Sequence, residues 1–184
     1  NEAYKSKLLS VDGPILFKDI DRGPQNMFYI YHKDLSNVSN RLRLIVMTYF
    51  DHAVEAVKIL SDIPIYGIGL DFVYGQENLK VLDSLNGKKL IAGVIDGRNI
   101  WKNNYHNTLT LLKDIEKNVK KEDIILSTTC SLLHVPYSLK HENHLDKDIK
   151  SWMIFAREKH DELSDVAKLF LFRIRHTRSG QLLI

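Results

Sequence analysis

From about residue 42 onward the sequence alternates between strand-like and helix-like segments, and this alternation restricts the fold more than any other feature. Runs of β-branched and apolar residues predict four strands, and apolar residues three or four apart predict a helix after each one. Such repetition is typical of βα units around a parallel sheet. The predicted strands are Leu42–Tyr49, Ile65–Val73, Lys89–Ile95 and Asp123–Thr128, and the predicted helices are the segment after Asp51, Gln76–Leu85, Tyr105–Val119 and Leu145–Phe170.

The spacing of the strands predicts the kind of parallel sheet. They recur every ~22 to 34 residues, close to the ~31 residues per unit of an eight-unit barrel of ~250 residues. We therefore expect an α/β fold, specifically a partial (β/α)8 TIM-type barrel of about four βα units that ends in a long helix.

The two ends of the chain do not follow this alternation. Residues 1–41 contain turn signals of the type Asp-Gly-Pro, and we expect an irregular entry segment with short strands there. Residues 172–184 are basic, and we expect a frayed tail rather than a nucleic-acid-binding arm. The half-barrel is then expected over residues 42–171, and the short strands of the entry segment at Lys7–Val11, Ile15–Phe17 and Met27–Tyr31.

Charge and composition exclude several classes of protein. The formal net charge is +3, with both signs interspersed, which is too mild to indicate a nucleic-acid partner. The longest uncharged apolar run, Leu44–Phe50, is far shorter than the roughly 20 residues of a membrane-spanning helix, so no membrane partner is expected. A single cysteine, Cys130, excludes an intrachain disulfide framework and indicates a cytoplasmic location. Glycine-rich nucleotide loops and the common hydrolase motifs are absent.

Polar residues follow each predicted strand. In parallel α/β folds the reactive groups gather at the carboxyl ends of the strands, so we expect these side chains to line one rim. The candidate rim residues are Thr48, Asp71, Arg98, Asn99, Cys130 and His134.

Several of these polar residues also have a structural interpretation. Asp51 suits the cap of the helix that follows it. Asp71 lies in an apolar strand and needs a partner, so a salt bridge with Arg98 and a substrate contact both remain open. Cys130 is either a small buried apolar residue or a metal ligand together with His134, but two ligands do not make a zinc site. Solvated surface positions are expected for His52, His141, His144 and His160.

Strings at the four strand ends resemble the amino-terminal domain of cobalamin-independent methionine synthase. They are V-M-T-Y-F at 46–50, G-L-D-F-V at 69–73, A-G-V-I-D-G-R-N-I-W at 92–101 and T-C-S-L-L-H-V-P at 129–136. The segment K-S-W at 150–152, with the helix after it, is also similar, so the resemblance covers about residues 42–170.

The resemblance implies a methyltransferase of methionine biosynthesis that moves a methyl group from 5-methyltetrahydrofolate polyglutamate to homocysteine. It implies zinc and homocysteine in a carboxyl-terminal barrel, where the metal holds the thiolate, and an amino-terminal barrel that helps to bind the folate tail. No cofactor and no catalytic residue is expected in this chain. When this sequence is aligned with the zinc-ligand positions of that carboxyl-terminal barrel, Val46, Thr48, Asp71 and Cys130 fall at the four positions. Two of the four are residue types that do not bind zinc, so the resemblance implies a degenerate metal site.

The chain departs from the family pattern because the first half of the barrel, with its basic folate-tail residues, is missing. We therefore expect a fragment, a truncated product or a divergent relative that is inactive alone. The alternative is a non-catalytic half-barrel that binds or assembles through its exposed sheet edges, with self-association as the consequence.

Overall fold

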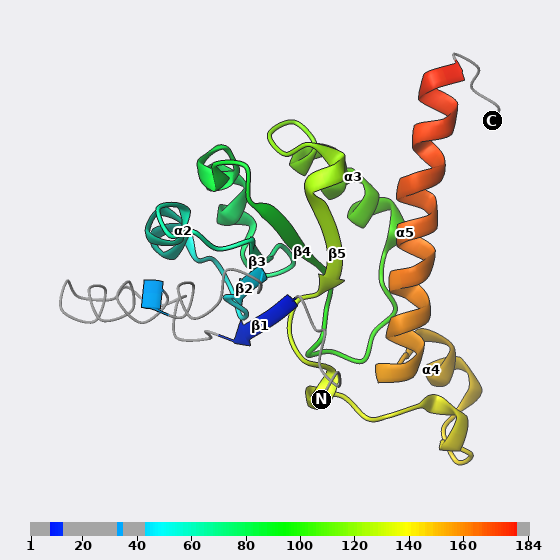
Figure 1. Cartoon of the computed structure of the whole chain (residues 1–184). Helices are drawn as coiled ribbons and strands as arrows, with labels where there is room; N and C mark the ends of the chain where they lie inside the picture. Colours follow the sequence, from blue (N-terminus) through cyan, green and yellow to red (C-terminus); the bar gives the residue numbers. More distant parts are fainter. Residues whose placement is uncertain (1–7, 13–32, 35–42, 180–184) are drawn as a thin grey trace, which may run out of the picture.

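A computed structural model of the chain describes residues 8–12, 33–34 and 43–179. These residues contain a five-stranded sheet in which all neighbouring strands are parallel (Figure 1). The strands lie in sequence order across the sheet, as they do in a (β/α)8 barrel. They are β1 (Leu8–Asp12), β2 (Arg43–Met47), β3 (Gly67–Asp71), β4 (Lys89–Ile95) and β5 (Ile124–Thr128).

Helical segments separate the strands from β2 onward and follow β5. The predicted α/β class is therefore confirmed. The α-helices are α2 (Val54–Ser61), α3 (Tyr105–Ile115), α4 (Lys147–Trp152) and α5 (Ala156–Ser179), and the 3-10 helices are η2 (Gln76–Leu85), η3 (Lys121–Asp123), η4 (Leu132–His134) and η5 (Leu139–His141).

The entry segment contributes a strand to the main sheet. β1 pairs with β2 in parallel, from Leu8 opposite Arg43 to Asp12 opposite Met47. The described sheet thus has one strand more than the four predicted units, because the short apolar run near the start of the chain pairs with the edge of β2. The other two predicted short strands, at residues 15–17 and 27–31, lie outside the described residues.

The predicted helix Leu145–Phe170 is two helices. Met153–Phe155 separates α4 from α5 and is buried in an extended conformation. Met153 forms an antiparallel bridge with Trp101, and the N–H of Ile154 donates to the carbonyl of Ile100 at 2.7 Å, so backbone pairing replaces helical hydrogen bonds there.

Two further boundaries differ from the prediction. The segment Gln76–Leu85 is helical as expected, but it is a 3-10 helix. The backbone of α5 continues as a helix to Ser179, into the segment predicted as a basic tail, and residues 180–184 lie outside the described residues. In the part of the chain that the structure describes, no helix combines the length and the apolar character that a membrane crossing requires.

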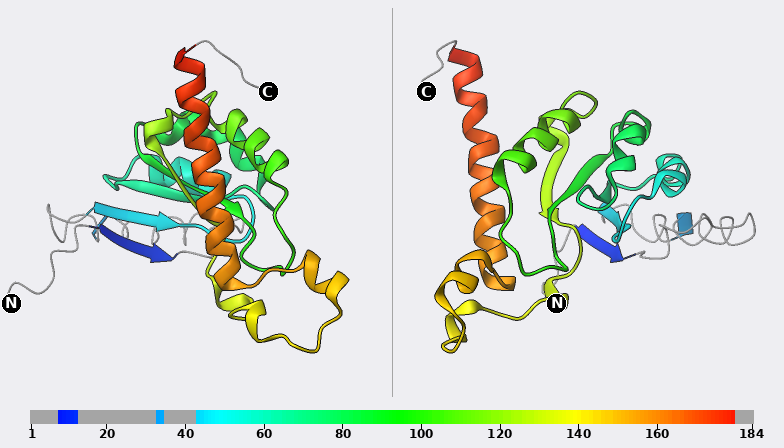
Figure 2. Two further views of the ribbon diagram at one scale, coloured as in Figure 1. Left: turned by 90° about the vertical axis from the view of Figure 1, so that its right-hand side faces the viewer. Right: turned by 180° about the vertical axis from the view of Figure 1, so that it is seen from behind.

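The two faces of the sheet carry different side chains. On one face, strand residues such as Val46, Ile68 and Leu90 pack with helix residues into the main apolar cluster. On the other face, Ile45 and Met47 belong to a small separate cluster, since successive residues of a strand point to opposite sides. Helix α5 packs against α3 and β5 (Figures 1 and 2). The helices therefore cover one face of the sheet, which is the arrangement of a barrel wall.

Candidate functional site

The carboxyl ends of the strands meet at one edge of the sheet, and we call the loops that follow β2 to β5 the rim. The rim comprises residues 48–51, 71–75, 96–101 and 129–134. Within it the structure places three of the six candidates at or near the surface: Arg98 and His134, which are exposed, and Asn99, which is half-buried. The other three are buried beneath the surface: Thr48, Asp71 and Cys130.

Asp71 organises the loops on both sides of its strand. Its side chain is only 1% exposed. Oδ1 accepts from the backbone N–H groups of Val73 (2.8 Å) and Tyr74 (3.0 Å), and Oδ2 accepts from the N–H of Asp51 (3.3 Å). Burial raises the pKa of Asp71, against the lowering effect of these hydrogen bonds and of the Arg98 charge. The salt bridge with Arg98 that the sequence left open is not among the described ion pairs, because backbone donors already satisfy the carboxylate.

The segment after β2 has a left-handed backbone over three successive residues. The φ angles of Tyr49, Phe50 and Asp51 are 44°, 55° and 104°. Gly75 lies against this segment, and a Cβ there would come within 2.5 Å of the carbonyl carbon of Asp51. Left-handed conformations of non-glycine residues cost free energy, persist only where surrounding contacts impose them, and cluster at functional sites.

Asn78 supplies the contacts that hold this segment. Its buried side chain donates from Nδ2 to the carbonyl of Asp71 (2.8 Å) and to that of Asp51 (3.4 Å), and Oδ1 accepts from the N–H of Ala53 (2.8 Å). The prediction that Asp51 caps the helix is wrong. Helix α2 follows Ala53, which has no side-chain cap, and Asp51 lies two residues too early, where its Oδ1 accepts from the N–H of His52 (2.7 Å).

Asp96 connects the loops after β3 and β4. Oδ1 accepts from the N–H groups of Arg98 (2.7 Å) and Asn99 (3.2 Å), and Oδ2 accepts from the Tyr74 hydroxyl and the Asn99 amide, both at 2.6 Å. The hydrogen bond to Asp96 raises the pKa of Tyr74. Both oxygens of Asp96 therefore accept two hydrogen bonds each, which fixes the loop and leaves the carboxylate little capacity for another partner.

The Arg98 guanidinium lies over two aromatic rings. Its Cζ is 4.0 Å from the ring centre of Tyr74 and 5.3 Å from that of Phe50. The ring of His134 contacts Phe50 edge-on, with 5.6 Å between the centroids. These ring contacts join the loops after β2, β3, β4 and β5, so the structure brings Arg98 and His134 together through Phe50, although the two do not touch directly in any described contact.

Helix α5 places a buried lysine beneath the rim. Lys159 is 1% exposed, and its Nζ lies 3.4 Å from Oδ1 of Asn99. Glu162, one turn further along, is 8% exposed and accepts from the N–H of Asn103 at 2.9 Å. Its other oxygen and the Asn103 amide nitrogen have no hydrogen-bond partner among the described residues. Burial lowers the pKa of Lys159 and raises that of Glu162.

Cys130 is packed as a small apolar residue. It is buried against Gly97, where an added Cβ would meet the Cys130 carbonyl oxygen at 2.8 Å and Sγ at 2.9 Å. Burial raises the pKa of the thiol, which disfavours the thiolate that metals and electrophiles require.

The four positions of the degenerate metal site do not line one pocket. Val46 belongs to the helix-side cluster, whereas Asp71 alternates with Leu70 of that cluster and so faces the other side of the sheet. The Thr48 hydroxyl donates to the carbonyl of Gly69 at 2.9 Å. Among the described residues, no three His, Cys, Asp or Glu side chains are grouped to hold a metal ion. The residues present therefore do not fit zinc.

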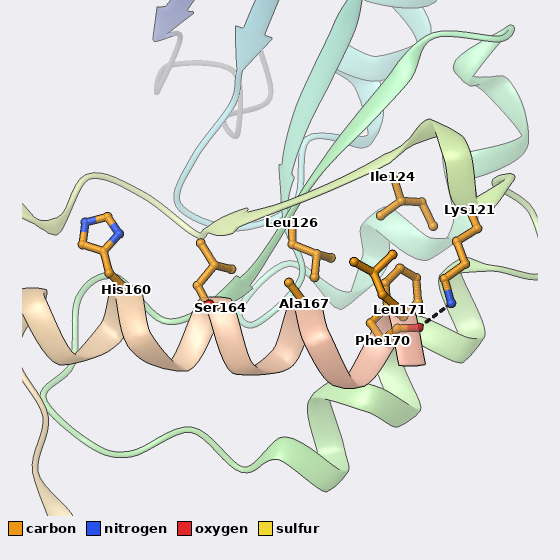
Figure 3. Close-up of a pocket in the computed structure, with 9 residues that line it drawn as sticks. Lys121, Ile124, Leu126, His160, Ser164, Ala167, Phe170 and Leu171 are labelled. Atoms are coloured by element: carbon orange, nitrogen blue, oxygen red, sulfur yellow. Dashed lines mark hydrogen bonds between the residues drawn. The ribbon is translucent and has the colours of Figure 1, made fainter. Parts of the chain in front are cut away.

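A separate cavity lies away from the rim, between α5 and the start of β5 (Figure 3). Its volume is about 440 Å³. The lining is mostly apolar, and the Lys121 ammonium at one end donates to the carbonyl of Phe170 at 2.6 Å. The amino end of a strand is opposite to the edge where barrel enzymes bind ligands, so this cavity and the rim are distinct features.

Sequence reasoning missed three residues that hold the rim together: Tyr74, Asn78 and Lys159. Tyr74 stood directly after a predicted strand and could have been included on that ground. Asn78 and Lys159 lie on helical segments, where their polar character is ordinary, and only the three-dimensional contacts show what they bind.

A parallel sheet in sequence order, with helices on one face and polar groups at the carboxyl ends of the strands, defines the class of barrel-type α/β proteins. Comparison with known families is more specific. The family described as "Cobalamin-independent synthase, N-terminal domain" matches residues 2–120. The chain therefore belongs to the cobalamin-independent methionine synthase family, as the strand-end strings predicted.

Individual relatives agree with this assignment. A protein of Desulforamulus reducens named 5-methyltetrahydropteroyltriglutamate–homocysteine methyltransferase is 90% identical over 162 residues, which cover 88% of this chain. A protein of the same name from Lactococcus lactis subsp. cremoris is 36% identical over 89% of the chain. The solved B12-independent methionine synthase of Shewanella sp. W3-18-1 matches 91% of the chain with a TM-score of 0.68 and 15% identity. This structural likeness confirms the predicted TIM-type fold class.

The chain is much shorter than the proteins it matches. It spans 21% of the D. reducens protein and 22% of the L. lactis protein. It covers 49% of the solved Shewanella chain.

Proposed function

We propose that the chain forms part of the amino-terminal barrel of an enzyme that transfers a methyl group from 5-methyltetrahydropteroyltriglutamate to homocysteine in methionine biosynthesis. The 90% identity with the D. reducens methyltransferase over 162 residues carries this proposal. The substrates of the whole enzyme, homocysteine and the methylated folate with its glutamate tail, would be the small-molecule partners.

The proposed part of this chain in the reaction is to shape the rim, with no catalytic residue and no cofactor of its own. The chemistry that zinc supplies, activation of the homocysteine thiol, belongs in this proposal to the other barrel of the enzyme. The donor set here supports that division, since Asp71 is saturated by backbone donors and Cys130 is buried against Gly97. The single buried thiol of Cys130 also supports a cytoplasmic location.

A chimera tests this function. The 162 matched residues replace the corresponding segment of the D. reducens methyltransferase, and methionine formation is measured with homocysteine, the triglutamate donor and zinc. We expect activity close to that of the unmodified enzyme. A chimera that folds, shown by its circular dichroism and gel filtration, but forms no methionine would contradict the proposal. The 184-residue chain alone is assayed in parallel, and we expect no turnover from it; robust turnover would refute the claim that it is inactive alone.

A second candidate function is assembly through the sheet edges. β1 and β5 are the two edge strands of the described sheet, and they carry the exposed apolar side chains of Leu9 and Ile125. Exposed edge strands are templates for pairing with another chain. Sedimentation velocity over a wide concentration range tests this candidate: dimers that form reversibly support self-association, and a monomer at the highest concentration excludes it.

A further inference from the structure

Arg98 differs from the other charged groups of the rim in what its side chain binds. The carboxylates of Asp71 and Asp96 are occupied by three and four hydrogen bonds. The Arg98 guanidinium, in contrast, forms no hydrogen bond or ion pair with any other described residue, and its contacts are with the rings of Tyr74 and Phe50. Its five N–H donors are therefore available at an exposed position.

The surrounding residues hold the guanidinium in place. The Tyr74 hydroxyl and the Arg98 backbone N–H both donate to the same Asp96 carboxylate, which fixes the ring and the arginine relative to each other. Phe50 reaches Arg98 from a segment with three successive left-handed residues, a costly backbone that Asn78 stabilises. Rings that cover the face of a guanidinium leave its edge, where the N–H groups point, open to a ligand.

The charge of the site indicates the class of ligand. A guanidinium edge matches a carboxylate or a phosphate oxygen pair through two parallel hydrogen bonds. The described contacts of the Arg98 side chain are with Tyr74 and Phe50, so no second cation touches the guanidinium, and the nearby Lys159 is buried and directed at Asn99. Each carboxylate group carries one negative charge, which the single positive charge of the guanidinium balances, whereas a dianionic phosphate group would keep one charge unbalanced. The half-exposed ring of Tyr74, at 47% of its surface, offers an apolar wall for the carbon chain that carries the carboxylate.

We propose that Arg98, held by Tyr74 and Phe50, is a binding site for the carboxylate of a small molecule at the rim. The proposal stands on the geometry of the rim and takes from the proposed function only the choice of one probe, since the relatives are named for a triglutamate substrate. Its failure would leave the chimera experiment untouched, because that experiment uses unaltered Arg98.

The test is a titration of the 184-residue chain with glutarate, tri-γ-glutamate and inorganic phosphate, followed by calorimetry and by the NMR signal of the Arg98 Nε–H. We expect saturable binding of both carboxylate probes with a shift of that signal, and weaker binding of phosphate. R98Q is expected to bind the carboxylates at least about tenfold more weakly, because a charge-assisted bidentate pair is lost, and R98K to fall between the two. R43Q is the matched control, since Arg43 is an exposed arginine over the ring of Tyr66 at the start of β2, at the opposite end of the strand from the rim.

The position of the ring is tested separately. Y74F keeps the ring over Arg98 but loses the hydroxyl bond to Asp96, so its binding should fall between that of the natural chain and that of Y74A, which loses the ring and should bind several-fold more weakly. Circular dichroism confirms that each variant is folded. Absence of saturable carboxylate binding, equal binding by R98Q, or tighter binding of phosphate than of glutarate would each overturn the proposal.

Discussion

The buried Asn78 side chain gives the sharpest prediction about stability. Asn78→Ala removes the acceptor of the Ala53 N–H and the donor to the Asp71 carbonyl, both bonded at 2.8 Å. Each buried group left without a partner costs about 1–3 kcal/mol, so the two together should lower the free energy of unfolding by about 4 kcal/mol. The third bond, to the carbonyl of Asp51, is 3.4 Å long and is left out of the sum because it exceeds the usual range.

Urea denaturation of the 184-residue chain measures this loss. With a slope of about 2 kcal/mol per molar urea, a loss of about 4 kcal/mol lowers the midpoint by about 2 M. Asn118→Ala is the control, because Asn118 is exposed after α3, and it should change the free energy of unfolding by less than about 0.5 kcal/mol. About 1 kcal/mol is the low end of the penalty for one buried group without a partner. If the free energy of unfolding of Asn78→Ala differs from that of the control by less than about 1 kcal/mol, the buried hydrogen bonds of Asn78 do not stabilise the rim.

Three further predictions concern single positions. Burial raises the pKa of Glu162, so the folded chain holds this proton more tightly than the unfolded chain does. The free energy of unfolding should therefore fall as the pH rises from the unfolded pKa through the folded pKa. Glu162→Gln should remove this loss, which urea titrations at successive pH values measure. Gly75→Ala should lower the free energy of unfolding by more than about 2 kcal/mol in the same assay, because the added Cβ would overlap the Asp51 backbone. Gly87→Ala is the control: its added Cβ meets only open space, and the free energy of unfolding should fall by about 1 kcal/mol. Elemental analysis should find far less than one zinc ion per purified chain, and Cys130→Ser should not change that content. About one zinc ion per chain that disappears in Cys130→Ser would contradict the packing assigned to the thiol.

The strands were predictable because their apolar runs reflect burial on both faces of a parallel sheet. Lys89–Ile95 was predicted with its observed bounds, and the other three strands within a few residues. The long final helix was predicted as one piece because Ile149, Trp152 and Ala156 keep helical spacing across the break. Pairing of the backbone at Met153 and Ile154 with the loop after β4 outweighs that local pattern, and such pairing depends on residues about 50 positions away.

The rim was predicted as a place, but the partners of its side chains were not. The alternation of predicted strands and helices placed Asp71, Arg98 and Asn99 at one edge of the sheet. The structure has them there, because parallel strands end at the same edge. A salt bridge between Asp71 and Arg98 was one of two alternatives that the sequence left open, and it is not among the described ion pairs because nearby backbone N–H groups already bind the buried carboxylate. The alignment with the zinc-ligand positions of the family's other barrel put Val46 at a ligand position. In the structure, the pleat of β2 directs the Val46 side chain toward the helices instead.

The distribution of hydrogen bonds at the rim bears on what this part of the barrel does. A carboxylate that acts in catalysis needs free lone pairs and access to substrate, but both oxygens of Asp96 and of Asp71 are engaged by loops and Asp71 is buried. These groups are thus suited to fix loop positions. Arg98 has the opposite character, since its position is fixed by rings while its donors stay available. The described rim thus combines two carboxylates that fix its loops with one guanidinium whose N–H groups remain for a ligand, so its side chains are better suited to position a bound group than to transfer a proton through Asp71 or Asp96.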